Sequence, residues 1–199
     1  MTSRARTAVL ISGRGSNMIA LIEAARSPDF LAEIVLVLSD DPGAAGLSRA
    51  RKLGVAAEAI DFRTHAGKPA FEAALDAQLA AASIEIICLA GFMRLLSPSF
   101  VERWRGRILN IHPSLLPDLR GLDTHGRALA QGFAEHGCTV HLVTAELDAG
   151  PILAQARVPV LSGDDAQVLA ARVLKEEHRI YPQALDEFAR SLRAAPGGA

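Results

Sequence analysis

The stretch Thr7-Ala-Val-Leu-Ile-Ser-Gly-Arg-Gly-Ser-Asn17 decides the fold class of this chain. Its apolar first half, residues 7–12, predicts a β-strand, and residues 16–26 predict a helix. The two glycines between them allow the backbone to turn sharply from strand to helix. A strand that leads through such a turn into a helix is the building unit of a parallel sheet. The stretch therefore indicates an α/β protein.

The same alternation of strand and helix continues along the chain. Further strands are predicted at residues 33–39, 56–60, 84–90 and 107–111, and helices at residues 44–53, 69–82 and 98–104. Strands that are almost continuously apolar, with helices between them, are typical of a parallel sheet covered on both faces. Because helical crossovers are right-handed, we expect a doubly wound, mostly parallel, Rossmann-like sheet.

After Pro113 the pattern changes to a loop rich in proline and glycine. The remaining predicted elements are a helix at 124–131, strands at 139–143 and 151–158, and a helix at 165–192. The two strands have only a loop between them, which indicates a hairpin or a mixed edge at the C-terminal side of the sheet. Pro182 is expected to kink or break the last helix. We expect a single domain over residues 1–199, with an ordered core at about 7–188 and a short flexible tail at 193–199.

The composition is that of an ordinary globular protein, with 50% hydrophobic residues, 22% charged residues and a formal net charge of −1. Such a charge creates no field that would attract nucleic acid or an anionic membrane. The apolar start of the chain is too short for a signal-peptide core or a membrane span. We therefore expect a cytoplasmic protein without nucleic-acid or membrane partners. Cys88 and Cys138 lie beside or within apolar runs and are expected to be buried free thiols.

The glycine-rich turn at residues 13–17 is a candidate phosphate site. Free N–H groups and a partial positive charge at a helix N-terminus attract anions, and Ser16 and Asn17 add side-chain donors. A dinucleotide site is an alternative, because Gly13-x-Gly15 is present and Asp40 follows the second strand where a ribose-binding acid belongs. The third glycine of that fingerprint is missing, since position 18 is Met. A tight turn with only a structural role also remains open.

A second candidate site follows the fifth predicted strand. Asn110 and His112 are two residues apart and so point to the same face of an extended strand. The acidic turn around Asp148 could bring a carboxylate to this edge, although Asp148 by itself could be only a turn residue and His112 only a structural histidine. An amide donor and an imidazolium suit acyl transfer, because they stabilise the oxyanion of a tetrahedral intermediate. A carboxylate nearby would raise the pKa of the histidine.

Six motifs carry a family resemblance. They are Gly13-Arg-Gly-Ser-Asn17, Ala90-Gly-Phe-Met-Arg-Leu-Leu96, Asn110-Ile-His-Pro-Ser-Leu-Leu-Pro117, Glu135-His-Gly-Cys-Thr-Val-His141, Leu147-Asp-Ala-Gly-Pro151 and Glu177-His-Arg-Ile-Tyr-Pro182. Over about residues 7–188 the chain resembles the folate-dependent formyltransferases, in the glycinamide ribonucleotide branch of purine biosynthesis. The resemblance implies an enzyme of one-carbon metabolism with that family's fold. It would transfer a formyl group from 10-formyltetrahydrofolate to the amine of N1-(5-phosphoribosyl)glycinamide through a tetrahedral intermediate.

The resemblance also implies roles for individual residues. Asn110, His112 and Asp148 match the catalytic residues, Gly15, Ser16, Asn17 and Glu177 match the nucleotide site, and Lys68, Met93, Arg94, Leu95, Leu96 and Asn110 match the folate site. Lys68 stands where the family commonly has an arginine. The folate is expected as a formyl-donor co-substrate, without a metal or NAD, and the protein as a monomer or homodimer.

The loop at residues 113–126 departs from the family pattern. Arg120 replaces a usual proline, and Asp123 stands where histidine or asparagine is frequent, before His125. Arg120-Gly121 is also found in methionyl-tRNA formyltransferases, whose extra C-terminal domain has no counterpart here. The conformation of this loop stays open. His136 is expected to be a solvated loop histidine.

Three alternatives remain. The chain could be a hydrolase of 10-formyltetrahydrofolate, although those enzymes generally carry an N-terminal regulatory domain and six residues precede the first strand here. It could be a formyltransferase for a different amine. From another class, it could be a non-catalytic nucleotide-binding module whose only site is the glycine loop. The presence of Asn110, His112 and Asp148 favours catalysis.

Overall fold

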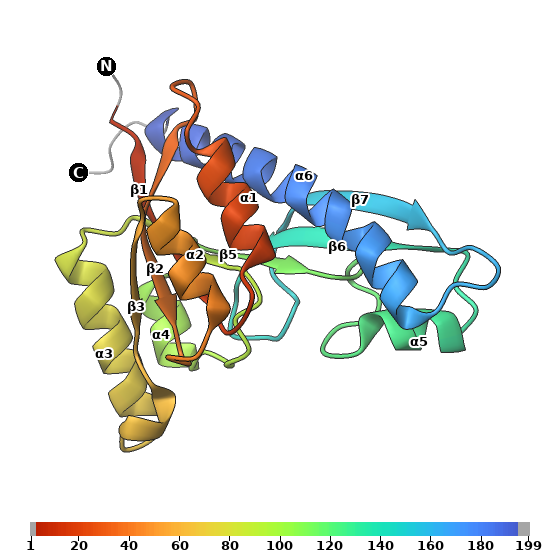
Figure 1. The fold of residues 1–199 in the computed structure, drawn as a ribbon, viewed down its shortest axis with the longest axis horizontal. Coiled ribbons are helices and arrows are strands. Elements are labelled where there is room, and N and C mark those ends of the chain that lie inside the picture. The colour runs from red at the N-terminus through yellow and green to blue at the C-terminus, as the bar shows by residue number, and fades with distance from the viewer. Residues whose placement is uncertain (1–2, 195–199) are drawn as a thin grey trace.

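The computed structural model describes residues 3–194 and is built around a seven-stranded sheet with the order β3-β2-β1-β4-β5-β6-β7 (Figure 1). The strands are β1 (Ala5–Ile11), β2 (Ala32–Ser39), β3 (Ala56–Ala59), β4 (Ile86–Leu89), β5 (Ile108–His112), β6 (Glu135–Leu142) and β7 (Ile152–Pro159). The helices are α1 (Ser16–Ala24), α2 (Ala45–Lys52), α3 (Lys68–Ala81), α4 (Pro98–Arg103), α5 (Thr124–Ala130) and α6 (Ala166–Ala194), with a 3-10 turn η1 (Phe62–Thr64).

The pairing of the strands confirms the predicted fold class. Strands β3, β2, β1, β4 and β5 are parallel, whereas β6 pairs with β5 and with β7 in the antiparallel direction. The order of the parallel strands reverses at β1, whose neighbours are β2 and β4. In a doubly wound sheet, ligands bind beyond the carboxyl ends of the strands on either side of such a reversal.

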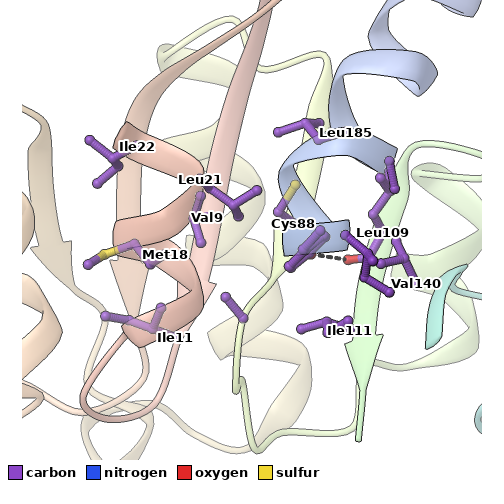
Figure 2. Packing of buried hydrophobic residues seen from close by; sticks show 14 of the residues in the cluster. Val9, Ile11, Met18, Leu21, Ile22, Cys88, Leu109, Ile111, Val140 and Leu185 are labelled. Atoms are coloured by element: carbon purple, nitrogen blue, oxygen red, sulfur yellow. Dashed lines mark hydrogen bonds between the residues drawn. The ribbon is translucent and has the colours of Figure 1, made fainter. Parts of the chain in front are cut away.

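Helices cover the two faces of the parallel sheet and bury its apolar side chains. On one face α1, α2 and α6 pack over the sheet, and on the other face α3 and α4 do so (Figure 1). Figure 2 shows Met18 and Leu21 of α1 beside Val9 of β1, and Cys88 of β4 beside Leu185 of α6. Cys88 and Cys138 are buried free thiols, as expected.

Helix α6 runs through Pro182 without a break, so of the two expected effects, a kink or a break, the break does not occur. A proline in a helix interior costs about 3 kcal/mol. In α6, however, the apolar residues before and after Pro182 are buried against the sheet. The hydroxyl of the preceding residue, Tyr181, donates to the carbonyl oxygens of Leu89 and Leu109 at 3.0 and 3.2 Å. These contacts offset the lost backbone hydrogen bond.

Two other local expectations need correction. Helix α6 extends to Ala194, so the expected tail does not begin at residue 193, and residues 195–199 lie outside the described part. His136 lies inside β6 and is buried, because that strand begins earlier than predicted. Over residues 3–194, no helix has both the length and the apolar character needed to cross a membrane.

Candidate active site

Strand β5 carries the first two residues of the predicted catalytic group. Asn110 and His112 occupy alternate positions of this strand and therefore share one face of the sheet. His112 is the last residue of the strand and is buried, and Asn110 is half-buried. Pro113 follows and has no N–H to donate. The polar pair thus lies at the carboxyl end of a strand, where this architecture places its ligands.

Asp148 reaches the same place from the turn between β6 and β7. Gly150 allows this turn to pass close to β6, since a Cβ at position 150 would lie 1.8 Å from the carbonyl oxygen of Leu142. Asp148 itself has a left-handed backbone, with φ of 50°. Its carboxylate is buried, and Oδ2 lies 3.4 Å from Nδ1 of His112. The structure therefore brings together the histidine and the carboxylate that the sequence separates widely.

His141 of β6 is a fourth member of this group, which the sequence did not identify as a functional residue. Its Nδ1 lies 2.9 Å from the carbonyl oxygen of Leu142, so Nδ1 carries the proton of the neutral ring. Burial lowers the pKa of His141, which favours this neutral form. Nε2 is then an acceptor, and Nδ2 of Asn110 donates to it at 3.1 Å. His141 lies opposite Asn110 in the β5–β6 register, and this pairing, which the sequence does not show, is what would have identified it.

The loop 113–126 lies against the histidine and the carboxylate. The N–H of Gly121 donates to Oδ2 of Asp148 at 2.9 Å, and Nε2 of His112 lies 3.1 Å from the carbonyl oxygen of Leu119. Because that carbonyl only accepts, Nε2 of His112 carries a proton. An exposed ion pair between Arg120 and Glu146, 2.7 Å long, joins the loop to the turn that carries Asp148.

The C-terminal end of this loop contains His125, which pairs with His136 of β6. Asp123 precedes α5 with a left-handed backbone, and Nδ1 of His125 lies 3.1 Å from Nε2 of His136. Burial lowers the pKa of both histidines, and that of His136 falls to about 4. The charge of His112 is a further cause for both. At neutral pH these two rings are therefore uncharged.

The predicted nucleotide site lies at the N-terminus of α1. Gly15 precedes the helix with φ of 70°, a conformation that side chains rarely adopt. Nδ2 of Asn17 donates to Oε2 of Glu177 at 2.6 Å, which brings a side chain of α6 beside the predicted nucleotide residues of α1. Burial raises the pKa of Glu177, and the hydrogen bond from Asn17 opposes that shift. Behind the loop, the N–H of Gly46 donates to the carbonyl oxygen of Gly13 at 3.0 Å.

The predicted folate residues lie in three places: the segment 93–96, the start of α3 with Lys68, and β5 with Asn110. The segment 93–96 follows β4, and its Met93 and Leu95 side chains are 67% and 64% exposed. The N–H of Met93 donates to Oγ of Ser12, which joins this segment to the end of β1. Lys68 is exposed at the start of α3.

Arg94 contacts the acid that a dinucleotide site would use. Nε of Arg94 donates to Oδ2 of Asp40 at 2.7 Å. Asp40 is therefore engaged by a neighbouring side chain instead of lying open to a ribose, which weakens the dinucleotide hypothesis. Among residues 3–194, no group of three or more histidine, cysteine or acidic side chains is placed to hold a metal ion, and metal-free catalysis stays a prediction.

Comparison with known proteins identifies the family. Residues 5–185 match the family described as Formyl transferase. The chain is 45% identical over 181 residues to the phosphoribosylglycinamide formyltransferase of Escherichia coli, covering 91% of this chain and 85% of that protein. A crystal structure of phosphoribosylglycinamide formyltransferase from Brucella melitensis is 55% identical and superposes with a TM-score of 0.91, covering 99% of each chain.

A human relative, the trifunctional purine biosynthetic protein adenosine-3, is 47% identical over 182 residues, which are 92% of this chain. This chain spans only 18% of the length of that protein. The matches to the single-enzyme relatives cover both partners almost completely. The chain therefore belongs to the formyl transferase family, in the branch of the phosphoribosylglycinamide formyltransferases.

Proposed function

We propose that this chain transfers the formyl group of 10-formyltetrahydrofolate to the amine of N1-(5-phosphoribosyl)glycinamide, a step of de novo purine synthesis. One observation carries the proposal beyond family membership. Asn110, His112 and Asp148 converge at the carboxyl end of β5, with His112 and Asp148 both buried. These three groups can stabilise an oxyanion and move a proton, which direct acyl transfer to an amine requires.

The amide of Asn110 is the proposed oxyanion donor. Attack of the amine on the formyl carbon breaks the C=O π bond and leaves a negative charge on the oxygen. One N–H of the Asn110 amide is held by His141, and the second N–H remains for this oxygen. A donor that is already oriented stabilises the developing charge without reorganisation during the reaction. We infer that His141 is a positioning residue for Asn110.

His112 is the proposed general acid. When the tetrahedral intermediate collapses, the C–N10 bond breaks and the folate nitrogen takes a proton. His112 delivers that proton, and the neutral imidazole then takes up the proton that the amine nitrogen loses as it becomes an amide, so the net protonation of the site is restored. The carboxylate of Asp148, 3.4 Å from Nδ1, stabilises the imidazolium by its opposite charge. No covalent enzyme intermediate is required.

The two substrates are assigned to neighbouring strand ends. The phosphate of the nucleotide binds the N–H groups around Gly15, Ser16 and Asn17, where the helix dipole favours an anion. The carboxylate of Glu177 accepts from the ribose hydroxyls. The folate lies along the segment 93–96 and Asn110, with Lys68 at its outer end.

A substrate-pair assay tests this function. The absorbance change of 10-formyltetrahydrofolate is followed with and without N1-(5-phosphoribosyl)glycinamide, and with other small amines in its place. Turnover that requires this nucleotide supports the proposal. Turnover with water alone identifies a hydrolase, and turnover with another amine identifies a different acceptor. The absence of turnover, with nucleotide binding retained, would leave a binding module.

A further inference from the structure

Asp40 is a buried carboxylate that the reaction proposed above does not use. It follows β2 at the carboxyl edge of the sheet, and its side chain is 5% exposed. Oδ2 accepts from Nε of Arg94, whereas Oδ1 is buried and has no hydrogen-bond partner among residues 3–194. An unpartnered buried acceptor is costly and calls for a functional or structural reason.

Arg94 is held in two directions around this carboxylate. Asp40 fixes the Nε edge of the guanidinium, and the ring of Phe62 lies under its plane, with 4.0 Å from the guanidinium carbon to the ring centroid. The carbonyl oxygen of Asp40 also accepts from the N–H of Phe62 at 3.2 Å. One residue therefore positions both the partner ring and the guanidinium.

This arrangement leaves one side of the guanidinium available. The Arg94 side chain is 41% exposed, and the hydrogen bond described for it uses Nε alone. The two terminal nitrogens form a planar pair of donors that suits two acceptor oxygens. A long flexible side chain that is already oriented loses less freedom when a ligand binds.

We propose that Asp40 is a positioning residue that orients the Arg94 guanidinium for the folate substrate. The inference rests on the proposed function, in which Arg94 contacts the folate. Asp40 itself touches no substrate. Its effect must therefore operate through Arg94 and must be specific to folate binding, and both properties can be measured.

The test is a double-mutant cycle with Asp40→Ala and Arg94→Met, in steady-state formyl transfer and in calorimetric binding of 10-formyltetrahydrofolate. We expect Asp40→Ala to raise the KM for the folate about two- to tenfold, the cost of ordering one flexible side chain. The KM for the nucleotide and kcat should change less than twofold. Asp40→Asn, which keeps the shape and a neutral acceptor, should give an intermediate value. The double variant should equal Arg94→Met, because the two residues act as one unit.

The matched control is Asp41→Ala. Asp41 is the adjacent exposed carboxylate, and its ion-pair partner is Arg63 at 3.9 Å. This variant removes the same charge without touching Arg94 and should leave the folate KM unchanged. Thermal unfolding of each variant sets a temperature at which all are folded, so that binding is compared between folded proteins.

Three results would overturn the inference: an unchanged folate KM in Asp40→Ala, additive effects in the double variant, or equal losses for both substrates. An unchanged folate KM in Arg94→Met would also overturn it, and would remove Arg94 from the proposed folate site. In that case formyl transfer by the parent protein would still stand, so the two failures are distinguishable.

Discussion

The parallel half of the sheet and its antiparallel edge contribute to the candidate site in different ways. In the parallel half, the glycine loop and the segment 93–96 follow directly from the ends of β1 and β4. At the antiparallel edge, Asp148, His141 and the loop 113–126 meet His112 through contacts between distant parts of the chain. The first region consists mainly of loop backbone and exposed side chains, whereas the second buries a network of charged and neutral groups.

In the proposed function, the nucleotide phosphate binds mainly at the parallel half, and the chemical step takes place mainly at the antiparallel edge. A change in the first region should therefore act on KM, and a change in the second on kcat. The comparison fails if variants of the two regions cannot be distinguished in this way.

The largest effect is expected for Asp148→Asn. This change removes the charge that stabilises the His112 imidazolium but keeps the size of the side chain. We expect kcat to fall by about two or more powers of ten, as when general acid catalysis is lost. The KM values should change far less, because the lost interaction operates mainly in the transition state. The pH–rate profiles of variant and parent are compared, and identical profiles with equal turnover would reduce Asp148 to a turn residue.

A change in the glycine loop should have the opposite signature. Gly15→Val places a branched side chain on a backbone with positive φ, where its Cβ would lie 3.1 Å from Cε of Met18 and 3.3 Å from Cα of Gly46. The free loop relieves strain of roughly 1–3 kcal/mol by leaving the binding conformation, and this energy is needed again on binding, so nucleotide affinity should fall about five- to a hundredfold. Calorimetry with each substrate measures this, and equal losses for the folate and the nucleotide would contradict the assignment of the phosphate site.

His141 tests whether the antiparallel edge acts through geometry. His141→Phe keeps an aromatic ring but removes the acceptor that holds Asn110. The loss of one oriented hydrogen bond should lower kcat about three- to tenfold and leave the KM for the nucleotide unchanged. His141→Gln, which can still accept from Asn110, should recover part of this loss. A fall in stability with unchanged kcat in His141→Phe would make the residue merely structural.

The buried histidines should make the antiparallel edge sensitive to acid. Burial lowers the pKa of His136 from 6.5 to about 4, so the unfolded chain binds more protons than the folded one between these values. Stability is then fully present above pH 6.5 and is lost as the pH falls toward 4, by roughly 1–3 kcal/mol. Urea unfolding across this range measures the slope, and His136→Gln should flatten it. Amide hydrogen exchange at acidic pH should be faster in α5, which carries His125 of this histidine pair, than in α1.

The smallest effect is expected for the ion pair between Arg120 and Glu146. Both side chains are exposed, and such pairs contribute about 0.2–1 kcal/mol. Arg120→Ala should therefore lower kcat less than about fivefold, and high salt should reduce the parent to the same level. Exchanging the two charges, in Arg120→Glu with Glu146→Arg, should restore the low-salt activity. If kcat still depends on salt in Arg120→Ala, the salt dependence arises from charges other than this ion pair.

The sequence by itself determined the order of the elements, the parallel sheet with its mixed edge, and the shared face of Asn110 and His112. The physical reason is that strand and helix periodicity, glycine turns and the strand pleat are properties of residues close together in the chain. Asn17 and Asp148 were candidates from their turns, and the family resemblance supported their roles and added Glu177. Their local sequence is compatible with simple turns or helix faces.

Only the tertiary structure decided which of these side chains meet. Asn110 and His141 are 31 residues apart, and Arg94 and Asp40 are 54 apart, so each pair depends on strand order and register. His136 was misassigned because strand β6 begins at Glu135 and pairs with β7 from that residue to His141. The continuity of α6 through Pro182 likewise depends on burial against the sheet. Local propensity specifies an element, but the contacts that orient a functional group arise when elements from distant parts of the chain pack together.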